Sequence, residues 1–207
     1  DMQVNFHTVN LKKKHPLQIS RGVHDKSKNL FVEIVKDGIT AWGESAPGKT
    51  EGAQTANEVQ LHLMRLVDSG IENLSIYEVY HRSKELKIPA CAQAAIDMAL
   101  WDLNAKKAKL KLKDLLGLPT PKSPTSITVG INPPEVVKER VEMILSNPDV
   151  RALKVKLGSP DGIEYDKLIY SQVIESTKKS NVAIRVDANG GWSLDEAKLM
   201  MKWLAKR

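Results

Sequence analysis

Cysteine is almost absent from this sequence, and that scarcity limits the classes of protein that fit it. The single cysteine is Cys91, so no disulfide can form within the chain and an internal disulfide framework is excluded. A reducing compartment, the cytoplasm, is therefore expected. Cys91 lies in the apolar run "ACAQAAIDMALW", where the expected role is that of a small core residue.

Long hydrophobic runs are also missing. No apolar run approaches the roughly 18 residues that a membrane-spanning helix requires. The start of the chain, "DMQVNFHTVNLKKK", lacks the basic-then-apolar order of a signal peptide. With 207 residues, of which 42% are hydrophobic and 27% charged, the composition fits a soluble globular protein of one or two domains with no membrane partner.

Aromatic residues make up only 5% of the chain, although its net charge is +6. The densest basic stretch, "KKAKLKLKD", contains five lysines but no aromatic residue and no arginine. Base stacking uses aromatic side chains, and bidentate base reading favours arginine. A solvated lysine-rich face explains this stretch better, so we expect no nucleic-acid partner. The alternative, a basic nucleic-acid binder, predicts steeply salt-dependent binding.

The first 122 residues are predicted to form an α+β domain. The stretches "VNFHTVNLKK" and "NLFVEIVKDGITAWGES" alternate apolar and polar residues as strands do, and Asp37-Gly38 is typical of a two-residue hairpin turn. Three antiparallel strands are expected, followed by helices near 53–68, 75–86 and 89–105 and by a short helix that ends at Gly117. The stretch "GLPTPKSPT", with three prolines within six residues, is typical of a linker.

Strands and helices alternate strictly over residues 123–207. The strands "TSITVGI", "RALKVKLG" and "VAIRVDANGG" are each followed by a helical pattern, near 133–146, 163–178 and 194–206. This order predicts parallel β/α units with right-handed crossovers. A complete eight-unit barrel needs roughly 250 residues. Residues 123–207 would therefore form either the first three units of a TIM-type barrel or a small open α/β domain.

Each of these three helices carries a candidate start signal. We expect the N-caps to be Asn132, Asp161 and Ser193. Ser193 would form a capping box with Glu196, because serine followed three residues later by glutamate satisfies two backbone N–H groups.

Two lysines and an aspartate lie at the carboxyl ends of strands, where chemistry gathers in parallel α/β folds. Lys154 and Lys156 share one face of their strand, while apolar residues occupy the other face. Asp187 ends the next strand, on the same face as Arg185. We expect these charged faces to lie near one another.

This combination suits the removal of a proton next to a carboxylate. That reaction needs a cation for the developing negative charge and a base at the carbon atom. A lysine is protonated at neutral pH, but a second ammonium group beside it disfavours protonation. Lys154 and Lys156 would thus supply a base and the group that tunes it. Asp187 would hold Mg²⁺, a hard cation that prefers carboxylate oxygens.

Each feature also has a plainer interpretation. Lysines two residues apart are common on a solvated strand edge. Asp187 before Asn189 and two glycines is also typical of a turn. One aspartate alone is a poor magnesium site. Their joint occurrence at the ends of successive strands favours the chemical interpretation.

The segments "ALKVKLG" and "IRVDANGGWS" resemble the second and third barrel strands of the enolase superfamily, in its muconate-lactonizing subgroup. The predicted meander, "GESAP" and "PACAQAAIDMALWDL" are similar to the capping domain of that family. The resemblance covers essentially the whole chain. It implies a capping domain at residues 1–122 and a partial (β/α) barrel domain at residues 123–207, the amino-terminal part of such an enzyme.

The resemblance also implies a role for each matching residue. Lys156 would take the α-proton of the substrate, while Lys154 would tune it and contact the substrate carboxylate. Asp187 would be the first of three carboxylate ligands to Mg²⁺, with Asn189 near the metal. Thr128, on the first barrel strand, matches a substrate-contacting threonine.

The stretch "PLQISRG" is similar to the specificity loop of dipeptide epimerases that act on Ala-Glu dipeptides. There Arg21 would meet the acidic side chain of the substrate, and a solvated loop cation is the alternative. The resemblance therefore implies an Mg²⁺-dependent epimerase that acts on a small dipeptide, or another carboxylate, through an enediolate. Alternatives within the subgroup are o-succinylbenzoate synthase, N-acylamino acid racemase and cycloisomerase.

The family's remaining catalytic groups have no counterpart here. Two metal carboxylates, a second catalytic lysine and an acidic motif for the dipeptide ammonium group belong to the fourth and later barrel strands. The 207-residue chain is therefore expected to be inactive by itself, and a catalytically incomplete fragment is the alternative to an enzyme. Exposed strand edges on a partial barrel would favour a homo-oligomer.

Overall fold

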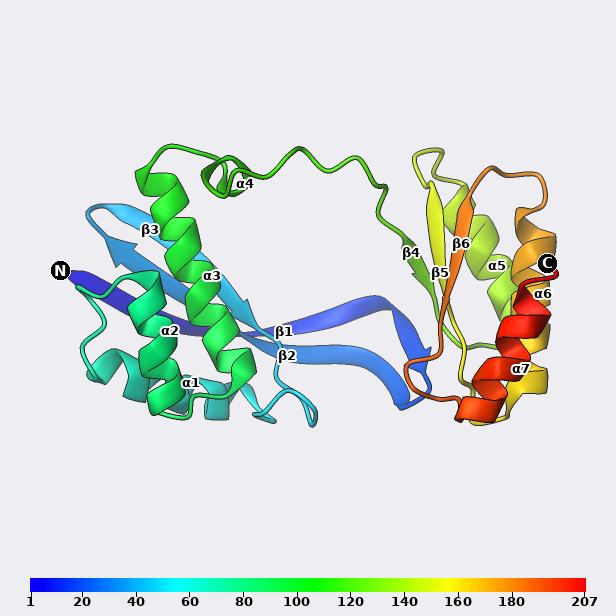
Figure 1. Cartoon of the computed structure of the whole chain (residues 1–207), viewed down its shortest axis with the longest axis horizontal. Coiled ribbons are helices and arrows are strands. Elements are labelled where there is room, and N and C mark those ends of the chain that lie inside the picture. The colour runs from blue at the N-terminus through cyan, green and yellow to red at the C-terminus, as the bar shows by residue number, and fades with distance from the viewer. The chain divides into compact units, whose positions relative to one another are not determined.

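The computed structural model describes residues 1–207, which divide into two compact units. Unit 1 contains residues 1–12 and 26–121, and unit 2 contains residues 13–25 and 122–207. Each unit has its own three-stranded sheet and its own hydrophobic core. Figure 1 labels the helices and strands.

Unit 1 is built on an antiparallel sheet with the strand order β1-β2-β3. Its strands are β1 (Met2–Ile19), β2 (Gly22–Lys36) and β3 (Ile39–Ser45). In the β2–β3 pair, Lys36 lies opposite Ile39. Asp37 and Gly38 join these strands with φ values of 53° and 75°, as a type I′ turn requires. The predicted hairpin turn is therefore confirmed.

Four helices complete unit 1, and the longest of them, α3 (Ala90–Lys107), packs directly on the sheet (Figure 1). Gly43 on β3 makes this close approach possible, because a Cβ atom there would lie 1.9 Å from the carbonyl oxygen of Ala95. Ala92, Ala95 and Ala99 of this helix are fully buried, so small residues on both sides bring helix and strand together. The helices are α1 (Ala56–Asp68), α2 (Ile76–Glu85), α3 (Ala90–Lys107) and α4 (Leu112–Leu115).

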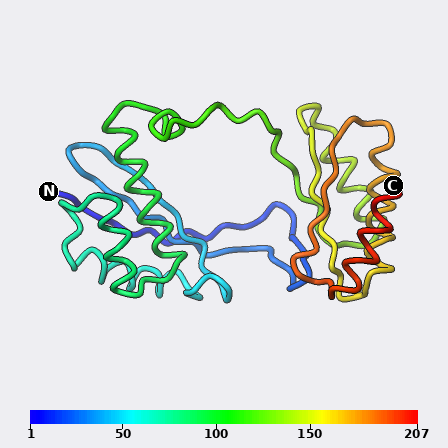
Figure 2. The backbone as a smooth tube through the Cα atoms, in the orientation of Figure 1, coloured from blue at the N-terminus to red at the C-terminus, as the bar shows by residue number.

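β1 and β2 extend further than the sequence pattern predicted. Their outer ends, residues 13–25, pack with unit 2 rather than with the core of unit 1. The carbonyl oxygen of Gln18 accepts a hydrogen bond from the backbone N–H of Ile131 at 2.9 Å. Figure 2 shows this hairpin tip, in blue, beside the strands of unit 2. The alternation of apolar and polar residues is weaker here because these residues do not pack on the core of unit 1.

Unit 2 consists of three parallel strands, each followed by a helix. The strands are β4 (Ile127–Val129), β5 (Ala152–Lys156) and β6 (Ala183–Asp187), and the helices are α5 (Pro134–Leu145), α6 (Ile163–Thr177) and α7 (Leu194–Leu204). Leu153 and Val155 of β5 are fully buried in the core beneath these helices. The predicted fold class, an antiparallel meander with helices followed by three β/α units, is confirmed.

The predicted helix starts of unit 2 are partly correct. Ser193 forms the expected capping box, since its hydroxyl accepts from Glu196 N at 3.2 Å and its N–H donates to the Glu196 carboxylate at 2.8 Å. The N-caps of the other two helices lie one residue later than predicted, at Pro133 and Gly162, and neither makes a side-chain capping bond. Asn132 and Asp161 were therefore wrong as caps.

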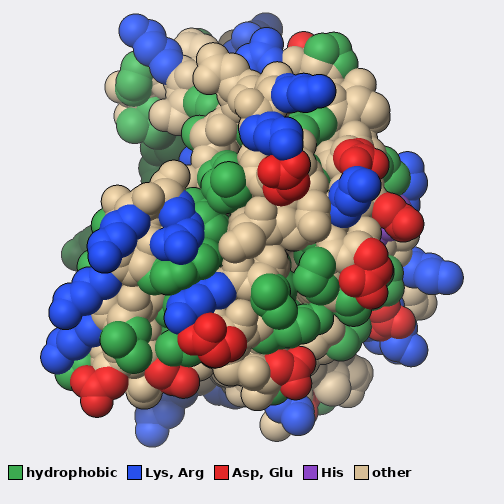
Figure 3. Space-filling view, turned by 90° about the vertical axis from the view of Figure 1, so that its right-hand side faces the viewer, with side chains coloured by type: hydrophobic (Ala, Val, Ile, Leu, Met, Phe, Trp, Pro, Cys, Tyr) green, Lys and Arg blue, Asp and Glu red, His purple; other side chains and the backbone are tan.

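Charged side chains of both signs are interspersed with apolar ones on the side of unit 2 that carries α6 and α7 (Figure 3). Leu168 on α6 and Met201 on α7 are among the exposed apolar residues, at 57% and 67%. No helix in the structure is both long enough and apolar enough to cross a membrane.

Candidate active site

The two lysines and Asp187 meet at the carboxyl ends of β5 and β6. Lys156 stands opposite Asp187 in the parallel register, and its Nζ donates a hydrogen bond to Oδ2 of Asp187 at 2.7 Å. Lys156 also donates to Oδ1 of Asn189 at 2.7 Å. Nζ of Lys154 lies 3.7 Å from the same Oδ2 atom. The structure thus brings together three residues that the sequence placed on one face, and their catalytic roles stay predictions.

Lys156 is the most buried member of this cluster. Its side chain is 7% exposed, compared with 34% for Lys154 and 32% for Asp187. A buried ammonium group is costly unless it is paired and hydrogen-bonded, and Asp187 and Asn189 provide both compensations. The tuning role of Lys154 stays a prediction, and the structure adds that the charged group in direct contact with Lys156 is the Asp187 carboxylate.

Asp187 is held as a carboxylate by the groups around it. The hydrogen bond from Lys156 is the main cause that lowers the pKa of Asp187 below its ordinary value. The backbone N–H of Asn189, which donates to Oδ1 at 2.9 Å, lowers it further, and partial burial acts in the opposite direction. Both carboxylate oxygens therefore accept hydrogen bonds from the protein.

The loop after β6 contains a contact that the sequence did not reveal. Asn189 adopts a positive φ of 49°, which asparagine tolerates better than most residues, and this turn directs its amide oxygen to Lys156. The sequence placed Asn189 near the metal, but its bond to Lys156 was missed. The "Asn-Gly" pair marked the turn without showing where the side chain would point.

The β1–β2 turn touches the same loop. The Ser20 hydroxyl donates to the backbone oxygen of Asn189 at 3.2 Å. Gly191 permits this approach, since a Cβ atom there would lie 2.7 Å from Cβ of Ser20 and 2.7 Å from the Gly158 oxygen. Ser20 lies in the stretch "PLQISRG" that was expected to approach the substrate, but only its neighbour Arg21 was predicted to take part in the site.

Thr128 and Arg21, the two remaining predicted residues, lie at the margin of the cluster. Thr128 is half-buried on β4 and pairs in register with Lys154, so it shares the sheet edge with the lysines. Arg21 follows Ser20 in the β1–β2 turn and is exposed. Arg185 pairs with Lys154 on the other side and is also exposed, which adds a third cation to this face.

The oxygen atoms present suit a magnesium ion in type but not in number. Asp187 and Asn189 offer hard oxygen ligands, which Mg²⁺ prefers. The chain contains no group of three or more His, Cys, Asp or Glu side chains arranged to hold a metal. The residues described here therefore fit a contribution to a magnesium site and do not complete one.

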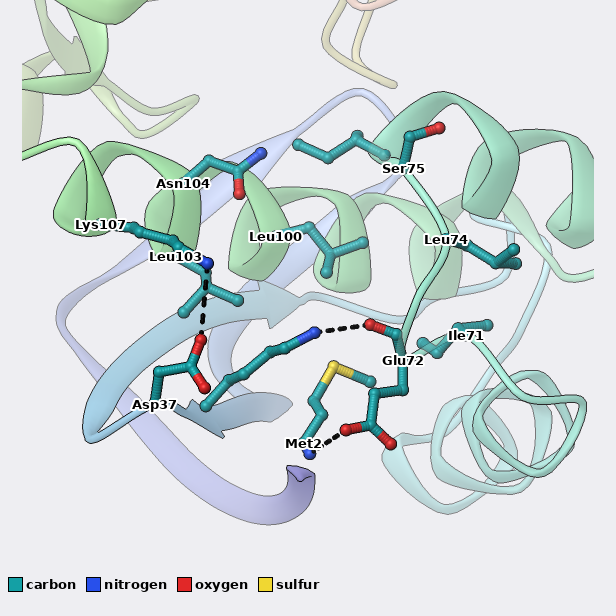
Figure 4. A pocket seen from close by; sticks show the side chains of 12 residues that line it. Met2, Asp37, Ile71, Glu72, Leu74, Ser75, Leu100, Leu103, Asn104 and Lys107 are labelled. Carbon is teal, nitrogen blue, oxygen red and sulfur yellow. Dashed lines mark hydrogen bonds and ion pairs between the residues drawn. The ribbon is translucent and has the colours of Figure 1, made fainter.

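A separate cavity of about 140 Å³ lies in unit 1, between the end of β2 and the helices α2 and α3 (Figure 4). Its charged side chains already have partners: Lys36 donates to the Glu72 backbone oxygen at 2.6 Å, the Glu72 carboxylate accepts from Met2 N at 2.9 Å, and Lys107 lies 3.4 Å from Asp37. None of the predicted site residues lines it. The lining offers no free catalytic group, so the candidate site stays at the edge of the β4-β5-β6 sheet.

The chain is similar over its full length to curated epimerases, and it spans 59% of their length. It is 56% identical over 206 residues to a hydrophobic dipeptide epimerase of Flavobacteria bacterium (strain MS024-2A), with 100% of this chain and 59% of that protein covered. It is 50% identical over 205 residues to a hydrophobic dipeptide epimerase of Roseobacter litoralis, with 99% and 59% covered.

A solved structure shares the same architecture. The crystal structure of a dipeptide epimerase from Enterococcus faecalis V583, complexed with Mg and the dipeptide L-Leu-L-Tyr, matches with a TM-score of 0.89 and 27% identity. The match covers 99% of this chain and 58% of that one. The solved protein therefore contains both the meander and the three β/α units in the same order.

A family assignment follows from the first part of the chain. Residues 2–117, from the start of β1 to the glycine after α4, match the N-terminal domain of the mandelate racemase / muconate lactonizing enzyme family. This match covers more than half of the 207 residues and agrees with the resemblance of the barrel strands. The chain belongs to the mandelate racemase / muconate lactonizing enzyme family of the enolase superfamily.

Proposed function

We propose that the protein is an Mg²⁺-dependent dipeptide epimerase, of which these 207 residues carry the capping domain and the first three barrel units. The observation that supports this most strongly is the cluster at the edge of the parallel sheet. There a largely buried Lys156 contacts Asp187 at 2.7 Å, and Lys154 stands beside them on the same strand. The family and the named relatives give this cluster its chemical context.

The proposed substrates are dipeptides with apolar side chains. Two relatives that are 56% and 50% identical to this chain are named hydrophobic dipeptide epimerases, and identity at this level supports a shared substrate class. An Ala-Glu dipeptide, which Arg21 in the β1–β2 turn would suit, is the alternative, but those two names do not support it. Arg21 is exposed and close to the site loop, so its contribution to specificity can be measured directly.

Lys156 is proposed as the acid/base on one face of the substrate. A neutral lysine amine has two N–H bonds and one lone pair, and Asp187 and Asn189 supply two acceptors at 2.7 Å each. As an ammonium group Lys156 has no lone pair, so it would act as the base only after giving up one proton. Its two remaining N–H bonds would then point to these acceptors and its lone pair to the α-proton. Proton removal forms a new N–H bond and leaves the C–H electron pair on the substrate as an enediolate.

Return of a proton to the opposite face would complete the epimerisation. The resemblance places that second acid/base on the sixth barrel strand, which these residues do not include. Lys154 and Thr128, neighbours across β4 and β5, would bind and orient the substrate carboxylate. Asp187 would contribute one ligand to Mg²⁺, which when bound supplies positive charge beside that carboxylate.

The experiment that tests this function is an exchange assay in deuterium oxide with the complete gene product. A panel would contain apolar dipeptides, L-Ala-L-Glu and a basic dipeptide, and deuterium at each α-carbon would be followed by NMR and mass spectrometry. We expect exchange at one α-carbon and the highest kcat/KM for apolar dipeptides. If no dipeptide takes up deuterium at an α-carbon, the epimerase proposal is wrong. Substrates of o-succinylbenzoate synthase, N-acylamino acid racemase and cycloisomerase would then be assayed.

A second proposal concerns the 207 residues alone. They span 59% of the relatives' length and contain no group of three or more His, Cys, Asp or Glu side chains that could hold a metal, so we propose that they are a catalytically incomplete part. The assay on these residues alone should give no exchange under conditions where the complete gene product is active. Turnover by the 207-residue chain would contradict this proposal and leave the epimerase proposal standing.

A further inference from the structure

Asp166 is a fully buried carboxylate on the first turns of α6, at 0% exposure. Its three hydrogen bonds all come from neutral N–H groups. Oδ2 accepts from Gly158 N at 2.9 Å and from Nε1 of Trp192 at 2.7 Å, and Oδ1 accepts from Ser159 N at 3.0 Å. The ion pairs of the chain do not include it, although acidic groups of this burial are normally paired with a cation.

The three donors come from two different loops, and each loop follows a strand that carries a site residue. Gly158 and Ser159 lie in the β5–α6 loop, which follows Lys156. Trp192 lies in the β6–α7 loop, which follows Asp187. One carboxylate therefore joins the segments that leave Lys156 and Asp187. The connection is direct, since both loops donate to the same oxygen atom, Oδ2.

The two loops are also in tight backbone contact at this point. A Cβ atom at Gly158 would lie 2.4 Å from the Ala188 carbonyl oxygen, so only glycine fits between them. Leu157 N donates to the Asp187 backbone oxygen at 3.0 Å. A small rotation of either loop would break these contacts and move the ends of β5 and β6 relative to each other.

We propose that Asp166 is a positioning residue, which locks the β5–α6 loop to the β6–α7 loop and so fixes Lys156 relative to Asp187. A buried apolar side chain could fill the same volume, but it could not hold two loops in a defined register because dispersion contacts lack direction. The expected effect on turnover rests on the proposed epimerase function. The expected effect on loop geometry does not.

Trp192→Phe is the sharpest test of this role. It removes the indole N–H that crosses between the loops and leaves the backbone bonds of Asp166 to Gly158 and Ser159 in place. Trp203→Phe is the matched control, because Trp203 lies at the other end of α7, where it packs on Tyr170 with ring centroids 5.7 Å apart. Both variants replace one indole ring of unit 2 with a phenyl ring.

Asp166→Asn provides a second test with the same volume. An asparagine at this position can keep only one oxygen, so its NH₂ group must face either Ser159 N or the pair formed by Gly158 N and Trp192 Nε1. In either orientation the NH₂ group, which is a donor, faces at least one N–H donor of the loops and cannot accept its hydrogen bond. The orientation that keeps the oxygen on Gly158 N and Trp192 Nε1 opposes only one donor and is therefore favoured. We expect the Asn variant to keep the Trp192 bond, to lose the Ser159 bond and to be less impaired than Trp192→Phe.

Two measurements decide the proposal. In the exchange assay, we expect Trp192→Phe to lower kcat by about 10-fold or more with KM changed less than about 3-fold, because misplacement by a fraction of an ångström weakens turnover more than binding. Trp203→Phe should keep the wild-type kcat. In ¹H–¹⁵N spectra, Trp192→Phe and Asp166→Asn should shift the Asn189 backbone amide, which donates to Asp187, and Trp203→Phe should not.

The outcomes separate the two proposals. A wild-type kcat in Trp192→Phe, with the Asn189 amide unshifted and only the melting temperature lowered, would overturn the positioning role. An equal fall of kcat in Trp203→Phe would overturn it as well, since the effect would then be one of packing. If the wild type exchanges no dipeptide, the epimerase proposal fails, and the Asn189 amide shift still decides whether Asp166 fixes the loops.

Discussion

Lys156 and Asp187 are register partners on adjacent parallel strands, and Nζ of the first lies 2.7 Å from Oδ2 of the second. The lysine side chain is 7% exposed and the aspartate side chain 32%, so solvent reaches the aspartate far more than the lysine. Lys154 approaches the same oxygen at 3.7 Å. This arrangement makes the two lysines unequal, and their substitutions should have different effects.

In the complete gene product, Lys156→Met should lower the rate of α-proton exchange by about 10²- to 10⁴-fold, the usual contribution of a general base, for the epimer whose α-proton faces Lys156. Lys154→Met should instead raise KM more than it lowers kcat, because Lys154 is proposed to hold the substrate carboxylate. Steady-state exchange kinetics measure both. Lys178→Met, at the residue that follows α6, is the control, because this lysine is 56% exposed. Full exchange activity in Lys156→Met would exclude it as the base.

The stability of unit 2 should fall at acidic pH because of Asp187. Its pKa is lowered in the folded protein, chiefly by the hydrogen bond from Lys156, so the unfolded chain binds more protons than the folded one as the pH falls below about 4. The stabilisation is thus present above the ordinary carboxyl pKa and is lost as the pH drops through the lowered value. Urea unfolding midpoints in metal-free buffer should decrease over this window. Asp187→Asn should flatten the decrease, and an unchanged slope would contradict this assignment.

Gly43→Ala should destabilise unit 1 by about 1 to 3 kcal/mol or more, as overpacking typically does. The new Cβ atom would lie 1.9 Å from the Ala95 carbonyl oxygen, so α3 would have to move off the sheet. Gly48→Ala is the matched control, since its nearest neighbour would be the Glu51 side chain at 3.6 Å. Urea unfolding followed by circular dichroism compares the two. Equal stability of both variants would show that α3 does not pack on β3 as described.

Leu153→Ala should cost about 2 to 5 kcal/mol of stability, because it leaves a cavity in the core of unit 2. Leu153 is fully buried on β5, opposite the face that carries the lysines. Leu168→Ala on α6, at 57% exposure, should change the free energy of unfolding by less than about 0.5 kcal/mol. Thermal or urea unfolding distinguishes them. A small effect at Leu153 would mean that the apolar face of β5 is not the core face.

Arg21→Met should separate the two proposed substrate classes. If apolar dipeptides are the substrates, kcat/KM for them should change by less than about 3-fold, because an exposed loop cation contributes little to binding an uncharged side chain. If L-Ala-L-Glu is a substrate, its kcat/KM should fall by about 10-fold or more through loss of a charge-assisted hydrogen bond. The exchange assay with both dipeptides measures this, and a large loss for apolar dipeptides would argue against our assignment.

Local patterns in the sequence predicted the architecture well. The "Asp-Gly" turn, the alternation of strands and helices and the Ser193 capping box depend on neighbours in the chain, and each appears in the structure. The shared face of Lys154, Lys156 and Asp187 follows from side-chain alternation and parallel pairing. These features could be predicted because the geometry of turns, helix caps and paired strands fixes them.

Contacts between residues distant in sequence could not be predicted in the same way. Asp166 has the sequence context of an ordinary acidic residue in the first turns of a helix, and only the structure shows that a loop beyond α6 reaches it through Trp192. The bond from Lys156 to Asn189 depends on the positive φ of that residue. The strand pattern did not show that residues 13–25 pack with unit 2, and only the resemblance of "PLQISRG" to a specificity loop placed part of this segment near the site.

The hairpin tip has a consequence for how the protein is made. Ser20 and its partner Asn189 are 169 residues apart, so the ribosome exposes the first long before the second exists. At about 5 to 20 residues per second, the tip waits roughly 8 to 34 s for the loop it will contact. During that interval residues 13–25, which include Lys13, Lys14 and Arg21, have no β6–α7 loop to contact. The contact between the hairpin tip and the site loop can therefore form only after β6 and the residues that follow it have been made.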